Sequence, residues 1–151
     1  MRIALATAAL LFVTTTPALA ADTDRLVWDS DEHAHPTQGR SGTWTPPELF
    51  SAREHPGNMI RIKGESPDGR EYLMIELTRH DGQRITEGSH EDQKVLVVNR
   101  GLGWVDEAGD FDVDHVAYGS DGQISEFDAA IEHHYLDEPD TTFRAKVSYR
   151  R

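Results

Sequence analysis

Apolar residues recur along the second half of the chain in short clusters, each bounded by Gly, Asp or Pro. The clusters are Met59–Lys63, Tyr72–Thr78, Val95–Asn99, Phe111–Tyr118, Gln123–His133 and Thr142–Tyr149. The turn signals between them are Ser66–Gly69, His80–Gly82, Gly101–Gly109, Ser120–Gly122 and Asp137–Asp140. Strands of this length and spacing are typical of antiparallel sandwiches and barrels. The pattern predicts an all-β fold, an antiparallel β-sandwich or flattened barrel of about seven to nine strands.

The part of the chain before Gly57 follows a different pattern. It is polar and is interrupted by Pro36, Pro46, Pro47 and Pro56. Proline removes a backbone donor and disfavours central strands. We therefore expect only short, irregular strands here, at Arg25–Asp29 and Leu49–Arg53.

Residues 125–136 fit two patterns. Ser125 can cap a helix with Asp128 three residues later. The same residues also alternate, with Phe127, Ala129 and Ile131 on one side and polar residues mostly on the other. Alternation fits better and favours a strand.

The last clusters predict a three-stranded meander with a defined register. The loop Ser120-Asp121-Gly122 places glycine where a type I turn with a bulge needs a left-handed residue. Directly opposed residues share a face of the sheet. The predicted pairs are His115 with Phe127, Val113 with Ala129, and Phe111 with Ile131, and the inward residues of the last strand are Phe143, Ala145, Val147 and Tyr149.

Residues 1–20 resemble a cleavable secretory signal. Arg2 is followed by the apolar run Ile3–Val13, which is too short to span a bilayer, and then by Ala18-Leu19-Ala20. We expect residues 21–151 to form a single β-sandwich domain that is secreted or periplasmic. No second apolar segment follows, so we expect no membrane span after signal cleavage.

Composition excludes several classes of function. The formal net charge is −12, which disfavours binding to nucleic acid. The chain has no cysteine and therefore no disulfide and no thiolate chemistry. No motif indicates a cofactor.

The most prominent candidate site is acidic. In the predicted register Asp114 lies opposite Asp128 and Asp110 lies opposite Glu132, with Asp112 between. Opposed like charges destabilise a sheet unless something compensates, and a divalent cation such as Ca²⁺ would do so. The alternative is a surface ladder of ion pairs, with Lys146 opposite Asp128 and Arg144 near Glu132. The ladder is favoured, because the spacing lacks the glycine and terminal glutamate of an EF-hand loop.

Histidines supply a second candidate. His33 and His35 would share a face in a strand, and Asp31 lies beside them. Two histidines and a carboxylate can bind Zn²⁺ or Cu²⁺. No third histidine is placed nearby, and solvated loop residues are the favoured interpretation. His115 is expected to point inward beside Phe127.

Catalytic motifs are missing from the sequence. It contains no G-x-S-x-G, H-E-x-x-H, P-loop or Rossmann pattern. A glycosidase-like pair of carboxylates stays open in so acidic a chain, but nothing selects one pair. Trp28, Trp44 and Trp104 would stack on sugars if exposed, although packing is the favoured role for each.

Two motifs suggest a family. Gly109-Asp110-Phe111-Asp112-Val113 is followed by D-G-Q-I-S-E-F-D-A-A-I-E-H-H, from Asp121 to His134, and by Phe143–Tyr149. This arrangement resembles uncharacterised secreted bacterial β-sandwich proteins that carry G-x-F-x-V, then D-G-x-[IV]-x-x-F-x-A-x-F-E-x-H-C. The resemblance covers residues 70–151, with a weaker match in its upstream part. It implies the fold and secretion, and it supplies no activity and no catalytic residue.

The chain departs from the family pattern at three positions. The resemblance implies a cysteine pair where this chain has Trp104 and Tyr135, and Ile131 replaces a phenylalanine. The predicted register also brings the residues before Asp110 alongside those after Glu132. We therefore expect the rings of Trp104 and Tyr135 to lie in contact near the surface.

These observations predict an exported acidic domain without enzymatic activity, acting as a binding or envelope-associated module. Two alternatives stay open. One is a secreted hydrolase that uses carboxylates or a histidine-bound metal, for which Asp31, His33 and His35 are the candidate ligands. The other is a divalent-cation-binding protein that uses the acidic face of the hairpin 110–132, with Asp110, Asp112, Asp114 and Asp128. The sequence does not identify the ligand.

Overall fold

The structure is a computed structural model that describes residues 24–45, 49–136 and 140–151. The expected secretory signal, residues 1–20, lies outside the described residues. Within them the chain forms nine strands: β1 (Arg25–Ser30), β2 (Ser41–Trp44), β3 (Leu49–His55), β4 (Met59–Glu65), β5 (Tyr72–Thr78), β6 (Gly88–Asn99), β7 (Leu102–Tyr118), β8 (Ile124–His134) and β9 (Thr142–Arg150). All pair antiparallel, so the predicted all-β antiparallel fold is confirmed.

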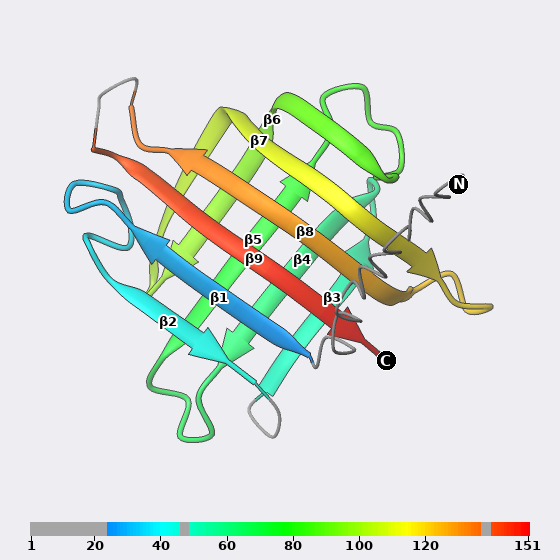
Figure 1. The fold of residues 1–151 in the computed structure, drawn as a ribbon, viewed down its shortest axis with the longest axis horizontal. Coiled ribbons are helices and arrows are strands. Elements are labelled where there is room, and N and C mark those ends of the chain that lie inside the picture. Colours follow the sequence, from blue (N-terminus) through cyan, green and yellow to red (C-terminus); the bar gives the residue numbers. More distant parts are fainter. Residues whose placement is uncertain (1–23, 46–48, 137–139) are drawn as a thin grey trace, which may run out of the picture.

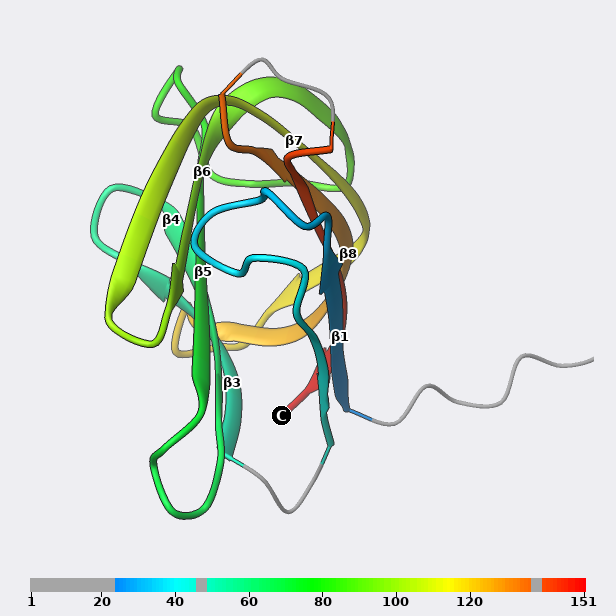
Figure 2. The ribbon, with the colours of Figure 1, turned by 90° about the vertical axis from the view of Figure 1, so that its left-hand side faces the viewer.

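The strands form one sheet in the order β2-β1-β9-β8-β7-β6-β5-β4-β3, which folds back on itself into a nearly closed barrel. In Figure 1, β2, β1, β9, β8 and the end of β7 lie in front of β5, β4 and β3, whose strands cross them steeply. Figure 2 shows the resulting two layers edge-on. The barrel is therefore flattened, and its last three strands form the predicted meander.

β7 joins the two layers. Its first half pairs with β6 alone, and from Asp110 onward it also pairs with β8. Gly109 lies at this corner, where a Cβ atom would sit 2.7 Å from Val95 Cγ2 and 3.1 Å from the Glu132 carbonyl oxygen. The close approach explains a glycine in the middle of a strand.

The core fills the space between the layers. Its largest fully buried side chains include Phe111, Phe127 and Phe143 from the meander. Trp28 and Trp44 are also buried, and their rings lie 6.1 Å apart at 15°. Each packs against a glycine: a Cβ at Gly42 would lie 2.6 Å from Trp28 Nε1, and one at Gly64 would lie 2.8 Å from the Trp44 ring.

Strand predictions held where apolar residues alternate and were wrong where they do not. Every predicted strand is present, and Tyr72–Thr78 has the predicted limits. The segment 125–136 is largely strand, as alternation indicated. β2 was missed. Gly101 does lie in a turn, but residues 102–109 are strand, because Gly103 and Gly109 allow close packing instead of chain reversal.

The predicted register of the meander is partly confirmed. Phe111 pairs with Ile131 and Val113 with Ala129, but His115 lies opposite Asp128 instead of Phe127. The turn is as predicted: the Gly122 N–H donates to the Gly119 carbonyl at 2.9 Å, and Gly122 has a φ of 75°.

Two irregularities that cancel each other cause the difference. In β7, Asp114 is an extra residue between Val113 and His115. In β8, Ser125 is an extra residue between Ile124 and Glu126, which pair with Tyr118 and Ala117. Between them the register is shifted by one residue, which exchanges the faces of the side chains. Val116 therefore packs against the core, and the prediction that His115 points inward was wrong.

Candidate ligand-binding groove

Most of the candidate acidic residues lie on the outer face of the layer formed by β2, β1, β9, β8 and the end of β7. Several of them form ion pairs. Asp128 receives hydrogen bonds from Arg150 at 2.9 and 2.5 Å and from the Ser148 hydroxyl at 2.8 Å. Burial alone would raise the pKa of Asp128, but these hydrogen bonds hold it below the usual value. Arg150, rather than a metal ion, therefore balances this carboxylate.

Of the two ion pairs predicted for the surface ladder, the position of one is confirmed and that of the other is wrong. Arg144 pairs with Glu132 in the register, and its Nε lies 3.9 Å from Glu132 Oε1. Lys146 lies opposite Ala130 instead of Asp128, because β9 is shifted by two residues from the predicted alignment. Asp110 does face Glu132 as predicted.

Asp31, His33 and His35 do not form the candidate metal cluster, and Asp31 and His35 contact different partners. Arg144 donates to Asp31 at 3.1 Å, and the Thr142 N–H donates to the other carboxylate oxygen at 3.1 Å. The hydrogen bond from Arg144 is the main reason that the pKa of Asp31 is lowered. The ring of His35 instead lies 4.4 Å from that of Tyr135. Across the described ranges no three His, Asp or Glu side chains form a group suited to hold a metal ion.

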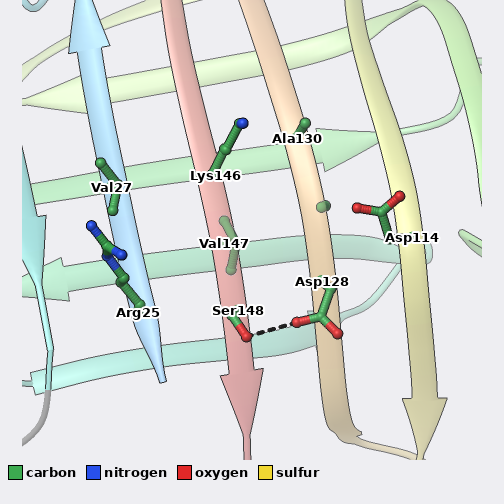
Figure 3. Close-up of a pocket in the computed structure, with 9 residues that line it drawn as sticks. Arg25, Val27, Asp114, Asp128, Ala130, Lys146, Val147 and Ser148 are labelled. Atoms are coloured by element: carbon green, nitrogen blue, oxygen red, sulfur yellow. Dashed lines mark hydrogen bonds between the residues drawn. The ribbon is translucent and has the colours of Figure 1, made fainter. Parts of the chain in front are cut away.

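A groove of about 380 Å³ crosses this face from β1 to β7 (Figure 3). Its middle follows a cross-strand row in which Ala130, Lys146 and Val27 lie side by side, and Asp112 extends this row beyond the groove. Ala130 and Val27 are short apolar residues, so the surface is hollowed above them. Two smaller hollows also reach Ala130, one toward Asp112 and one toward Arg144.

Charges of opposite sign stand on the two sides of the groove. Arg25 and Lys146 extend from β1 and β9, whereas Asp114 extends from the bulge in β7 toward Ala130 (Figure 3). Among the described residues none of these three side chains has a hydrogen-bond or ion-pair partner. The prediction that Asp114 lies opposite Asp128 was wrong, because Asp114 is the bulged residue and has no cross-strand partner, and His115 lies opposite Asp128 instead.

The groups around the groove are poorly arranged for hydrolysis. The Ser148 hydroxyl donates to Asp128, which Arg150 keeps ionised and weakly basic. His115 contacts Glu87 at 2.8 Å and Glu126 at 3.1 Å, so carboxylates occupy both of its ring nitrogens. Nucleophilic catalysis needs a hydroxyl bonded to a free base, and glycoside hydrolysis needs a carboxyl group with a raised pKa. Neither Ser148 nor Asp128 meets these needs.

Two of the three tryptophans have the packing role that was favoured. Trp28 and Trp44 are buried in the core, and only Trp104 is exposed to a solvent-borne ligand.

The sequence did not identify the groove. Arg25, Val27 and Lys146 were not recognised as site residues, and Ala130 was counted only as part of an alternating strand. The one local signal is a short apolar residue on the charged side of two strands, Val27 in β1 and Ala130 in β8.

Comparisons with known proteins supply no relative. No protein-family model matches the chain, and neither curated proteins nor solved structures give a match. No helix within the described ranges is long and apolar enough to cross a membrane. The candidate site must therefore be judged on its own geometry.

Proposed function

We propose that the protein is a non-enzymatic binding module that holds a small dipolar ligand in the groove. The observation that carries this proposal is the pair of unpartnered charges, Lys146 and Asp114, on either side of Ala130. A ligand with an ammonium group and a carboxylate would satisfy both. Charge-assisted hydrogen bonds of this kind are stronger than neutral ones.

The spacing indicates the size of the ligand. β9 and β7 are separated by β8, so they stand two strand spacings, about 10 Å, apart. Hydrogen bonds of about 2.8 Å at each end leave roughly 4–5 Å between the ligand's charges. A dipeptide can adopt this span, whereas the two charges of an α-amino acid lie closer together. The short side chains of Ala130 and Val27 leave room for its backbone.

Export, as expected from residues 1–20, would place such a module in the periplasm or outside the cell, where small peptides are available. The cation-binding and hydrolase alternatives make different demands on the same surface. A cation site would need the carboxylates to face the ion without the positive charge of Lys146 beside them. A hydrolase would instead cleave the molecule that it binds.

The proposal can be tested by NMR titration of amide resonances with three probes. They are alanyl-alanine, its N-acetyl derivative, which is only anionic, and its amide, which is only cationic. We expect saturable shifts at Val27, Ala130 and Lys146 with alanyl-alanine and much weaker shifts with the others. Equal shifts with all three probes, or none at millimolar concentration, would contradict the proposal.

Variants locate the site. Ala130→Leu fills the hollow and Lys146→Gln removes one charge, so both should weaken binding of alanyl-alanine, whereas Lys94→Gln on β6 should not. Two further measurements distinguish the alternatives. Shifts at Asp112 and Asp114 with Ca²⁺ that Lys146→Gln strengthens would favour a cation site, and release of free alanine would favour a hydrolase.

A further inference from the structure

A second surface lies away from the groove, where the β6–β7 hairpin meets the end of β8. All large hydrophobic side chains that are exposed within the described ranges gather there: Leu102 at 58%, Trp104 at 38%, Val105 at 39% and Leu136 at 52%. Trp104, Val105 and Leu136 line one depression of about 320 Å³ together with Asp106, Glu107 and His134. We call these residues, with Leu102, the hairpin patch. Clustered exposed apolar side chains mark interaction sites more often than scattered ones.

The hairpin patch is held in place by contacts between segments far apart in sequence. The ring of Trp104 packs against Tyr135, which in turn packs against His35. The Nε2 of His133 lies 3.1 Å from the Trp104 carbonyl oxygen, and the His134 N–H donates to Asp106 at 2.7 Å. A surface fixed before binding loses little conformational freedom when a partner arrives.

The charge around the hairpin patch is acidic. β7 continues from Val105 with carboxylates at Asp106, Glu107 and Asp110, and the paired strand β6 adds Glu91 and Asp92. Lys94 lies 3.5 Å from Glu107 and offsets only part of this charge. Asp106 is engaged by His134, so Glu107 is the exposed carboxylate of the depression.

We propose that the hairpin patch binds a segment of a partner protein that carries both aliphatic and basic side chains. The aliphatic side chains would pack on Trp104 and Leu136, and a Lys or Arg would pair with Glu107 or lie over the Trp104 ring. A second copy of this chain fits poorly, because it would bring the same carboxylates against each other. An anionic lipid surface is repelled for the same reason.

Trp104 provides a built-in reporter, because Trp28 and Trp44 are buried. The full protein is titrated with a capped peptide that alternates Lys and Leu, and Trp104 emission is recorded. Two matched peptides serve as controls, one alternating Glu and Leu and one alternating Lys and Ser. We expect a saturable blue shift with the Lys–Leu peptide alone, weakened by salt.

Variants separate the two components of the proposed surface. Leu136→Ser removes an apolar contact and should weaken binding about tenfold. Glu107→Gln should weaken it about twofold to fivefold, the range for an exposed ion pair. Asp68→Asn makes the same change of charge in the β4–β5 turn and should have no effect, and a melting curve for each variant shows that it is folded.

Several results would overturn the proposal. They are equal binding of the Glu–Leu or Lys–Ser peptide, and an effect of Asp68→Asn as large as that of Glu107→Gln. Self-association that Leu136→Ser abolishes would identify a second copy as the occupant instead. A shift of Trp104 emission with phosphatidylcholine vesicles but not with the peptide would identify a membrane.

Discussion

The rings of Trp104 and Tyr135 meet nearly edge to face, with centroids 4.4 Å apart and planes at 69°. The two residues lie at the start of β7 and just after β8, so their contact closes one end of the meander. The sequence predicted this contact from the register and from the resemblance together. The contact confirms the neighbourhood of the two residues, while the family resemblance itself stays a prediction.

This pair should be energetically coupled. Edge-to-face aromatic pairs contribute about 0.5–1.5 kcal/mol beyond the area they bury. A double-mutant cycle with Trp104→Leu and Tyr135→Leu should return a coupling free energy in that range, measured by urea unfolding followed by circular dichroism. As a control, a cycle between Trp104 and Tyr118, at the other end of β7, should return a value near zero. Additive losses at Trp104 and Tyr135 would show that the rings touch without stabilising each other.

Alternation along the sequence was enough to find most of the fold, because an inward apolar residue at every second position is a local signal. It did not find β2 or the first half of β7. Ser41–Trp44 is too short to alternate visibly, and Leu102–Gly109 contains glycines that normally mark turns. At Gly109 the reason for the glycine is close packing against Val95, which only the folded chain shows.

The candidate groove could not be predicted from the sequence, for a related reason. It depends on Val27 of β1 lying beside Lys146 of β9, a contact between opposite ends of the chain. It also depends on the bulge at Asp114, and the compensating irregularity at Ser125 leaves the register the same at both ends. The predicted pair of Phe111 with Ile131 is therefore correct, although the residues between the two irregularities are shifted by one position.

Gly42 and Gly64 should tolerate no side chain, because the buried rings of Trp28 and Trp44 occupy the space of a Cβ atom. Gly42→Ala and Gly64→Ala should each lower the free energy of unfolding by about 1–3 kcal/mol, the usual cost of overpacking a core. Gly119→Ala is a suitable control, since its Cβ would meet chiefly the end of the Asp121 side chain, at 3.1 Å, instead of a buried ring. Equal stability of all three variants in urea unfolding would contradict this account of the Trp28–Trp44 packing.

Salt should stabilise the protein at neutral pH. The net charge of −12 is spread over a surface where Asp112 and Asp114 have no ion-pair partner among the described residues. Screening should weaken their repulsion and raise the melting temperature by roughly 2–4 °C, which corresponds to about 1 kcal/mol at this size. Asp112→Asn should raise the melting temperature at low salt and do little at high salt. A melting temperature that falls steadily as salt is added would mean that the existing ion pairs outweigh the repulsion.

Mild acid should destabilise the protein through His133. This side chain is buried, its Nε2 donates to the Trp104 carbonyl oxygen at 3.1 Å, and its Nδ1 has no partner in the described structure. Burial lowers the pKa of His133 in the folded state, more than the hydrogen bond to Trp104 raises it. The unfolded chain, with a histidine pKa of about 6.5, therefore binds a proton more readily than the folded one.

The sign of the pH dependence follows from this difference. The contribution of His133 to stability is complete above about pH 6.5 and is lost as the pH falls toward the folded-state pKa. The free energy of unfolding should then drop by up to about 1.4 kcal/mol per pH unit for this group. His133→Gln, whose amide can still donate to the Trp104 carbonyl, should flatten the curve in this range, whereas His33→Gln at an exposed position should leave it unchanged. The same slope in the wild type and His133→Gln would assign the acid sensitivity to other groups.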